Sequence, residues 1–283
     1  KQTILCTGAL EQQAVFHNND LPGVMMSSAA QRLIHLYAVR PGQAAVIITG
    51  NNDGYANALD LLDAGVEVRA IVDLREQPAN NPMIDAAVAR GIRIETGHAV
   101  HEAHKARNHL SAVEIRKIIS PGICADSGEV IPCDLLCMAV GYTPTYQLVC
   151  QGGGQLSYDD ESSMFTLTNC PQDCQIAGSV NSHWLLDDVI ADAKRAAIIA
   201  TNALALTTET VPETIALSQQ QSPNFGWPIF AHPKGKEFVD FDEDLQIADI
   251  INATKDGYEH IQLVKRYSTC GMGPSQGRHS ALA

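Results

Sequence analysis

The stretch that decides the fold runs from residue 44 to residue 73 and reads AAVIITGNNDGYANALDLLDAGVEVRAIVD. An apolar run at 45–48 is followed by a glycine-containing turn at 50–54, and apolar residues then recur at helical spacing until Gly65. A second apolar run ends at Asp73. A strand, a helix and a second strand in this order are typical of a βαβ unit, so the sequence predicts a parallel sheet and an α/β fold.

The turn of this unit lies where dinucleotide-binding domains carry a Gly-x-Gly-x-x-Gly motif. Gly50 permits the tight turn, but Asn52 stands where the backbone must approach a pyrophosphate, and Tyr55 stands at the third glycine position. Asp73 follows at about the distance expected of an acid that binds a ribose. Two interpretations stay open: a nucleotide-binding fold kept as a scaffold, or a nucleotide site. The residues of that site would be Gly50, Asn51, Asn52, Gly54 and Asp73.

Length and composition restrict the class of protein. The 283 residues suffice for about two domains at ~150 residues each. With 45% hydrophobic and 18% charged residues, and no apolar run of ~18 residues, the chain reads as globular and not membrane-spanning. A net charge of −13 disfavours nucleic acid and anionic membranes as partners. The eight cysteines form no disulfide-framework pattern, which favours a cytoplasmic location.

A second strand-to-helix segment lies later in the chain. A strand at 174–177 leads into the turn Gly178-Ser179, and apolar residues between Leu185 and Ala200 predict a helix about five turns long. The two strand-to-helix segments together predict an α/β core.

Cys6-Thr7-Gly8 follows the opening strand, an apolar strand runs from Asp134 to Pro144, and Gly178-Ser179 precedes the long helix. These spaced motifs resemble the pyridine nucleotide-disulfide oxidoreductase family of two-domain flavoproteins. The resemblance implies a two-dinucleotide-binding-domain, Rossmann-like core with an inserted nucleotide domain, followed by a small helical domain. The expected divisions are a FAD/NAD-type domain from residues 1–41 and 146–206, an inserted NAD-type Rossmann domain from 42–145, a linker from 207–229 and a helical domain from 230–283. The resemblance implies cofactor contacts at Thr7, Gly8, Gly178 and Ser179. The family carries an acid where Ser179 stands, and a neutral hydroxyl tolerates a diphosphate better than it serves a flavin ribityl chain. NAD is therefore the expected cofactor of this subunit, with FAD as an alternative.

Three further strings are similar to the alpha-subunit family of heterotetrameric sarcosine oxidases: FHNNDLPGVM at 16–25, FVDFDEDL at 238–245 and KRYSTCGMGPSQGR at 265–278. This resemblance implies oxidative demethylation of sarcosine to glycine, with O2 reduced to hydrogen peroxide and the one-carbon unit passed to tetrahydrofolate. It also implies beta, gamma and delta subunits as partners, and FAD and FMN in the complete complex. We expect the chain to be an internal piece, with one phosphate loop before Lys1 and the tetrahydrofolate domain after Ala283.

Related oxidoreductase subunits carry four cysteines for an iron–sulfur cluster in their helical module. The corresponding positions here are Asp240, Asp242, Ser275 and Ser280, which lack the thiolates of a [2Fe–2S] site, so no such cluster is expected. Two alternatives remain beside the sarcosine oxidase assignment. One is a subunit of a related opine or amino-acid oxidoreductase acting on another N-substituted amine, and the other is a non-catalytic scaffold subunit.

Possible metal ligands and nucleophiles carry less weight. His98, His101 and His104 could bind Zn²⁺ or Cu²⁺, but no fourth ligand is apparent, and we expect exposed loop histidines. The cysteine pairs 133/137 and 170/174 have three residues between their members, a spacing less usual for zinc. No nucleophile, base and acid can be assembled into a catalytic set. We therefore expect no catalytic residue and no metal site in this chain.

Overall fold

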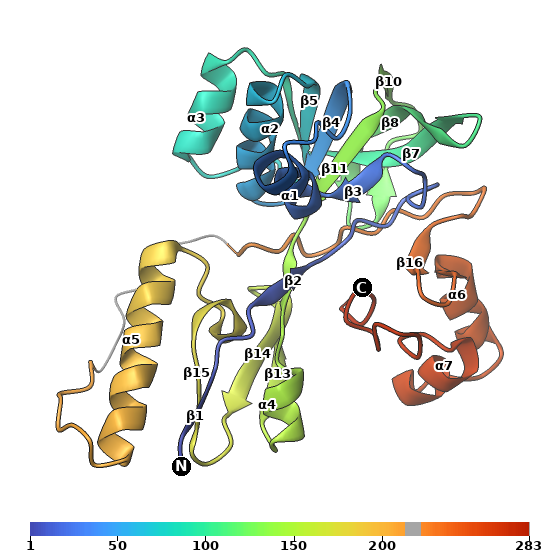
Figure 1. Ribbon diagram of the computed structural model, residues 1–283. Helices are drawn as coiled ribbons and strands as arrows, with labels where there is room; N and C mark the ends of the chain where they lie inside the picture. The colour runs from blue at the N-terminus through green and yellow to red at the C-terminus, as the bar shows by residue number, and fades with distance from the viewer. Residues whose placement is uncertain (213–221, 283) are drawn as a thin grey trace. The chain divides into compact units, whose positions relative to one another are not determined.

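A computed structural model describes residues 1–212 and 222–282, which form a mixed α/β structure (Figure 1). The chain divides into two compact units. Unit 1 comprises Lys1–Leu10 and Tyr142–Pro223, and unit 2 comprises Glu11–Gly141 and Asn224–Ala283. Among the described residues, no helix is long and apolar enough to span a membrane.

The centre of unit 2 is a five-stranded parallel sheet with the order β3-β11-β4-β5-β6. The predicted βαβ unit is present as β4, α2 and β5. The bounds of the strands are Val24–Met26 (β3), Ala44–Thr49 (β4), Glu67–Asp73 (β5), Ile94–Thr96 (β6) and Leu135–Ala139 (β11), and those of the helices are Ser27–Tyr37 (α1), Asp53–Asp63 (α2) and Pro82–Ala89 (α3). The α/β prediction is confirmed.

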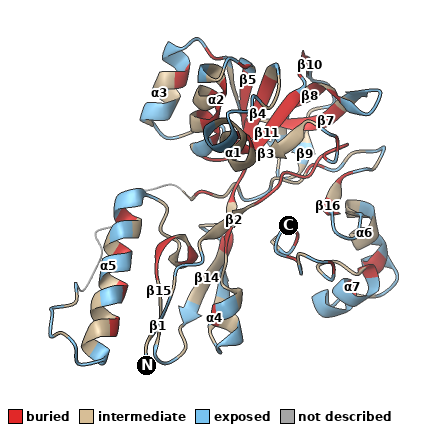
Figure 2. Cartoon of the chain, in the orientation of Figure 1, coloured by how far each residue is buried: buried red, intermediate tan, exposed pale blue. Residues whose placement is uncertain are grey.

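Both faces of this sheet are covered, which explains its continuous apolar strands. Along β4, Ala45 and Ile47 pack in the core with the helices, whereas Val46 and Ile48 pack in a second core on the other face. Successive side chains of a strand point to opposite faces, so one strand serves both cores. Figure 2 shows the buried residues, in red, concentrated in this part of the chain.

The second core is closed by an antiparallel meander. Its strands are β7 (His98–Ala106), β8 (His109–Ser120) and β10 (Glu129–Pro132), with β9 (Ile123–Cys124) paired to β8. We expected the histidines of β7 in a loop and predicted no strand there. The expectation of exposed loop histidines was wrong, because His98, His101 and His104 lie on β7 and His101 is only 6% exposed.

The C-terminal part of unit 2 contains β16 (Phe238–Asp240), β17 (Leu245–Gln246), α6 (Ile247–Lys255) and α7 (Ile261–Ser268). Its helices match the expected small helical domain, yet the module belongs to the same compact unit as residues 11–141. Two buried side chains explain this. Gln13 donates to the carbonyl of Val239 at 2.8 Å, and the Asn19 amide both donates to and accepts from the Phe238 backbone at 2.9 Å.

The expected domain limits differ from these units in two further respects. Residues 11–41 lie in unit 2, because β3 is an edge strand of the parallel sheet and α1 packs beside it. The expected linker, 207–229, is partly outside the described residues, and its last part packs on unit 2. There the Phe225 N–H donates to the carbonyl of Val140 at 2.9 Å, and Val15 pairs with Ile229.

Unit 1 is built on the parallel pair β1 (Thr3–Leu5) and β15 (Cys174–Ile176). Helix α5 (Leu186–Ala203) contacts both strands and has 18 residues, which agrees with the predicted five turns. The remaining elements are β2 (Ala9–Glu11), β12 (Tyr142–Pro144), α4 (Gln147–Gln151), β13 (Gln155–Asp159), β14 (Met164–Asn169) and the 3₁₀ turn Gly178–Asn181 (η1).

Candidate functional site

Two glycines of unit 1 meet at the carboxyl ends of its parallel strands. Gly8 follows β1 and Gly178 follows β15, with φ values of +73° and +85°, a region that side chains other than glycine rarely adopt. A Cβ atom built on Gly8 would lie 3.8 Å from the Ser179 hydroxyl. The structure therefore brings together the residues that the sequence placed in the first cofactor site. In α/β folds, ligands bind beside the carboxyl ends of parallel strands.

The neighbouring side chains fix this turn. The Thr7 hydroxyl donates to the carbonyl of Thr145 at 2.7 Å. Asp192 of α5, which is 1% exposed, accepts from the Gly178 N–H at 2.9 Å and from the Asn181 amide at 3.1 Å. Asp192 thus fixes the turn from its position on α5, whereas Ser179 presents a neutral, half-buried hydroxyl. Helix α5 begins at Leu186, so its first turn lies seven residues beyond Ser179.

The turn of the inserted domain has a different environment. Asp73 is completely buried, and its carboxylate accepts from the Tyr55 hydroxyl at 2.7 Å and from the Arg75 guanidinium at 2.7 and 3.0 Å. Burial, followed by the negative charge of Asp73 and its hydrogen bond, raises the pKa of Tyr55, so the phenol remains a donor. Both oxygens of the predicted ribose-binding acid are therefore engaged by the protein itself.

The space beside Gly50 is also filled. A Cβ atom on Gly50 would lie 2.5 Å from Cβ of Phe225, which packs against the core of unit 2. Arg75 reaches the same turn, donating to the Asn52 side chain and to the Asn51 carbonyl, both at 3.2 Å. The structure brings Gly50, Asn51, Asn52, Gly54 and Asp73 to one end of the sheet, as the sequence predicted. Their groups are bonded to one another, a geometry that favours the scaffold alternative.

The four positions compared with iron–sulfur ligands form hydrogen-bonded pairs. The Ser280 hydroxyl donates to Asp240 at 2.9 Å, and the Ser275 N–H donates to Asp242 at 2.7 Å. Asp240 also accepts from the Gly271 N–H at 2.8 Å, and it is 2% exposed. Hydrogen bonds from Ser275 lower the pKa of Asp242. Carboxylates and hydroxyls thus tie the loops of this module together, with oxygen rather than thiolate groups at its centre.

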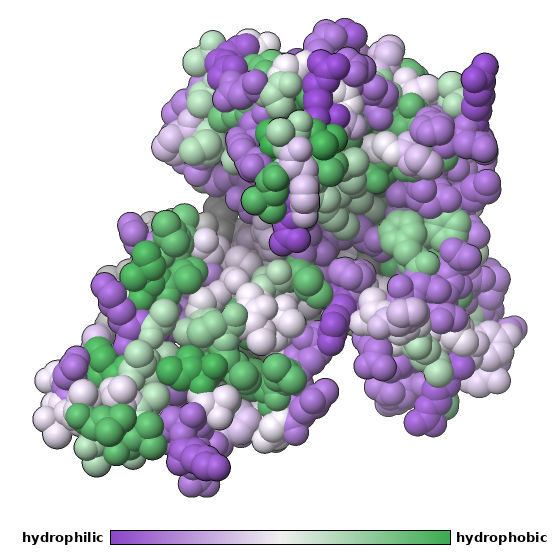
Figure 3. All heavy atoms as spheres, in the orientation of Figure 1, coloured by the Kyte–Doolittle hydropathy of each residue, from purple (hydrophilic) through white to green (hydrophobic). Residues whose placement is uncertain are grey.

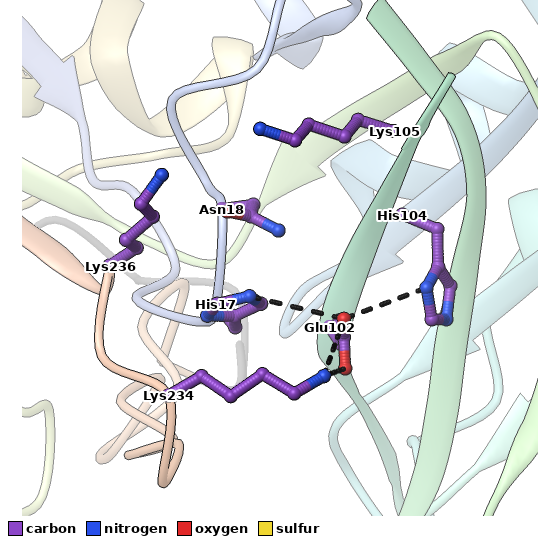
Figure 4. Close-up of a pocket in the computed structure, with 7 residues that line it drawn as sticks. All are labelled: His17, Asn18, Glu102, His104, Lys105, Lys234 and Lys236. Carbon is purple, nitrogen blue, oxygen red and sulfur yellow. Dashed lines mark hydrogen bonds and ion pairs between the residues drawn. The ribbon is translucent and has the colours of Figure 1, made fainter. Parts of the chain in front are cut away.

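A cluster of imidazoles around Glu102 was not predicted. Glu102, on β7, is 8% exposed and lies within 3.9 Å of His17 and 3.6 Å of His104, both drawn in Figure 4. The His232 ring lies 3.4 Å from the same carboxylate. Lys234 approaches both carboxylate oxygens at 3.3 Å. The His-x-x-His-x-x-His spacing singled out residues 98–104 as possible ligands, but it gave no sign that His17, His232 and Lys234 surround Glu102, because these three come from distant segments.

Neighbouring positive charges keep the Glu102 carboxylate ionised. Burial acts to raise the pKa of Glu102, but hydrogen bonding to Lys234 and the charges of His104, Lys234 and His17 outweigh it and lower the pKa. Burial, with the charges of Arg116 and His232, lowers the pKa of His101 to about 4. One group among the described residues has metal-ligand spacing, and it consists of Glu102, His104 and Glu114. The carboxylates are already paired with Lys234 and Arg116.

The cysteines carry no sign of a reactive centre. Each of the eight, all within the described residues, is a free thiol. Cys133 and Cys137 are buried, and burial raises the pKa of Cys133 to about 12. Burial and the neighbouring Cys174 raise the pKa of Cys170 to about 11. High thiol pKa values disfavour the thiolate form that zinc binding and disulfide exchange require.

The paired turns at the ends of parallel strands are typical of a Rossmann-like α/β fold. Solved structures support this fold. L-Proline dehydrogenase from P. horikoshii superposes with a TM-score of 0.66 and 17% identity, covering 99% of this chain and 51% of that chain. Thioredoxin reductase from T. acidophilum superposes with a TM-score of 0.58 and 16% identity, covering 72% of this chain and 66% of that chain. At such identities the likeness establishes the fold alone, and it confirms the Rossmann-like prediction.

Curated proteins provide the sequence comparison. The chain is 32% identical over 281 residues to sarcosine oxidase subunit alpha of Rhizobium meliloti (strain 1021), covering 99% of this chain and 27% of the relative. It is 29% identical to sarcosine oxidase subunit alpha of Corynebacterium sp. (strain P-1), covering 100% of this chain and 30% of the relative. Residues 234–283 match the model of the sarcosine oxidase A3 domain. The resemblance to sarcosine oxidase alpha subunits is confirmed, and the chain spans 27–30% of the length of these relatives.

Proposed function

We propose that this chain is a section of an alpha subunit that takes part in the oxidative demethylation of sarcosine. In the proposed reaction, sarcosine yields glycine, O2 becomes hydrogen peroxide, and tetrahydrofolate receives the one-carbon unit. The observation that carries the proposal is the similarity over 99% of the chain to a sarcosine oxidase alpha subunit, together with the A3 domain match. That domain match favours sarcosine oxidase over a related opine oxidoreductase.

The proposed task of unit 1 is to hold NAD, with FAD as the alternative cofactor. Thr7, Gly8, Gly178 and Ser179 lie at the carboxyl ends of β1 and β15, and the positive-φ glycines leave room for a close approach of a diphosphate to the backbone. The Ser179 hydroxyl provides a neutral donor beside it. Asp192 anchors the turn from α5, so the geometry of these residues does not depend on the ligand. Bound NAD would supply a nicotinamide ring that can exchange hydride.

The proposed task of the inserted domain is structural. Its turn is bonded internally through Asp73 and Arg75 and is covered by Phe225, so it serves as a scaffold rather than as a second nucleotide site. Docking of the beta, gamma and delta subunits is part of the same proposal. Exposed apolar side chains of α5, where apolar surface is green in Figure 3, support such contacts; they include Leu186 and Ile190. FAD and FMN would belong to the complete complex, which we expect in the cytoplasm.

The test begins with the purified full-length complex. Mass spectrometry of released nucleotide should find NAD in this subunit, and an assay with sarcosine and tetrahydrofolate should produce hydrogen peroxide and glycine. FAD in this subunit would replace the NAD assignment, and a lack of nucleotide would leave only the scaffold role.

Site variants locate the nucleotide within the subunit. Ser179→Asp places a charge beside the diphosphate and should reduce the NAD content at least tenfold. Ser157→Asp, an exposed serine of the same unit on β13, is the matched control and should retain NAD. Equal NAD loss in both variants, or NAD loss in neither, would contradict binding at Ser179.

A further inference from the structure

A cavity in unit 2 lies apart from both dinucleotide turns. Its volume is about 410 Å³, and Figure 4 shows its lining: His17, Asn18, Glu102, His104, Lys105, Lys234 and Lys236. Three ammonium groups therefore face one carboxylate. This local excess of positive charge stands out in a chain whose net charge is −13.

The three lysines are not equivalent. Lys234 is paired with Glu102, at 3.3 Å from both carboxylate oxygens. Lys105 and Lys236 have no acidic partner among the residues that the structure describes, and in Figure 4 both side chains extend toward the space beside Asn18. Two ammonium groups without counter-ions thus share one cavity.

The part of the cavity wall between Lys105 and Lys236 is held in place by hydrogen bonds within the protein. Asn18 adopts a left-handed conformation with φ of 61°, and its amide donates to the carbonyl of Ala103 at 2.9 Å. Its backbone N–H donates to the carbonyl of Lys236 at 2.8 Å, and the His17 ring bonds the carbonyl of Gly235. The backbone that carries Lys236 is therefore fixed to the loop at 17–18 before any ligand binds, which lowers the entropic cost of binding.

We propose that this cavity binds a small phosphate monoester. Two unpaired ammonium groups match the two negative charges of such an ester, and lysine binds phosphate as a point charge. The cavity also has room for an organic group attached to the phosphate.

A divalent cation is the competing ligand, because Glu102, His104 and Glu114 have metal-ligand spacing. Such an ion would have to displace Lys234 from Glu102 and Arg116 from Glu114, whose contacts are 3.3 and 2.8 Å. It would then lie in a cavity lined by three lysines. Coulomb repulsion therefore favours the anion.

The experiment titrates the full chain with glycerol 2-phosphate and with inorganic phosphate by calorimetry at low ionic strength. We expect saturable binding that weakens about tenfold in Lys105→Gln and in Lys236→Gln, a loss of ~1.4 kcal/mol for each variant. The double variant should show no saturable binding. Lys117→Gln, an exposed lysine of β8, is the matched control and should bind like the parent chain. An absence of saturable binding to the parent, or equal weakening by Lys117→Gln, would overturn the proposal.

Glu102→Gln separates the anion from the cation. Loss of the carboxylate removes repulsion and frees Lys234, so phosphate affinity should rise several-fold. A cation site would instead lose Zn²⁺ or Mn²⁺ binding in this variant, and stoichiometric metal binding by the parent chain would overturn the proposal. Succinate serves as a dicarboxylate probe, and binding as tight as that of the phosphate ester would overturn the choice of phosphate. Ser179→Asp should leave phosphate binding unchanged, so this test is independent of the NAD proposal.

Discussion

The two turns at the ends of parallel strands, one in each unit, differ in how accessible their polar groups are to a ligand. Around Gly8 and Gly178, positive-φ glycines and a half-buried Ser179 hydroxyl leave the turn accessible to a ligand. Around Gly50, the groups that could bind a nucleotide are bonded to one another and covered by Phe225. Position in a Rossmann-like fold therefore does not make a binding site, because the polar groups must also be free.

The largest expected effect tests whether the acid of the inserted domain is structural. Asp73→Asn removes a buried charge that accepts from Tyr55 and Arg75, and Arg75 would remain largely buried without its partner. Breaking a buried ion pair costs about 3–5 kcal/mol, so the free energy of unfolding should fall by about that amount. Urea denaturation followed by circular dichroism measures it, while NAD content should stay unchanged in the molecules that fold.

Ser179→Ala is the matched variant in the other turn. It removes a half-buried hydroxyl and should change the unfolding free energy by less than about 1 kcal/mol. A small effect of Asp73→Asn accompanied by loss of NAD would reverse the comparison and place the nucleotide in the inserted domain.

Local patterns predicted a large part of these two regions. The βαβ unit follows from the alternation and the helical spacing at 44–73, and β4 and β5 pair in parallel as expected. Gly8 and Ser179 meet because each lies beyond the end of one of two parallel strands. Each of these depended on periodicity or on a spaced motif.

What the sequence did not indicate depends on contacts between distant segments. Phe225 covers the Gly50 turn from 175 positions later in the chain, and no local signal links them. Strand β7 escaped prediction because register shifts at Val100/Glu102 and His104/Lys105 interrupt the two-residue alternation. The Glu102 cluster was not predicted because its members come from three separate segments of the chain.

The second prediction concerns pH and the buried groups of unit 2. Because the folded pKa of His101 is lowered from 6.5 to about 4, the unfolded chain binds more protons between these values. Stability should therefore fall as the pH drops from 6.5 to 4, by at most ~3 kcal/mol from this group. In unit 1, hydrogen bonds from Ser162 lower the pKa of Asp159. The contribution of Asp159 to stability is therefore lost only when the pH falls below the ordinary pKa range of a carboxyl group.

Urea denaturation at several pH values measures how the free energy of unfolding changes with pH. His101→Gln should remove the part of this pH dependence that one proton causes between pH 4 and 6.5, so the variant tests whether His101 is the group responsible. Stability that stays flat from pH 7 to pH 4 in the parent chain would contradict it.

The smallest expected effect asks whether Phe225 is what closes the Gly50 turn. Gly50→Ala places a Cβ atom 2.5 Å from Cβ of Phe225, so the segment that carries Phe225 must shift, at a cost of about 1–3 kcal/mol. In a Phe225→Gly background, which removes that Cβ atom, this contact disappears, and the cost of Gly50→Ala should fall by at least about 1 kcal/mol. Gly8→Ala is the control, since its Cβ would have only the Ser179 hydroxyl at 3.8 Å, and its strain comes from the positive φ alone. Thermal unfolding of the double-mutant cycle measures the coupling energy. Additive effects would mean that Phe225 does not close the turn, whereas coupling confined to Gly50 would identify the chain's own later segment as the group that takes the place of a nucleotide.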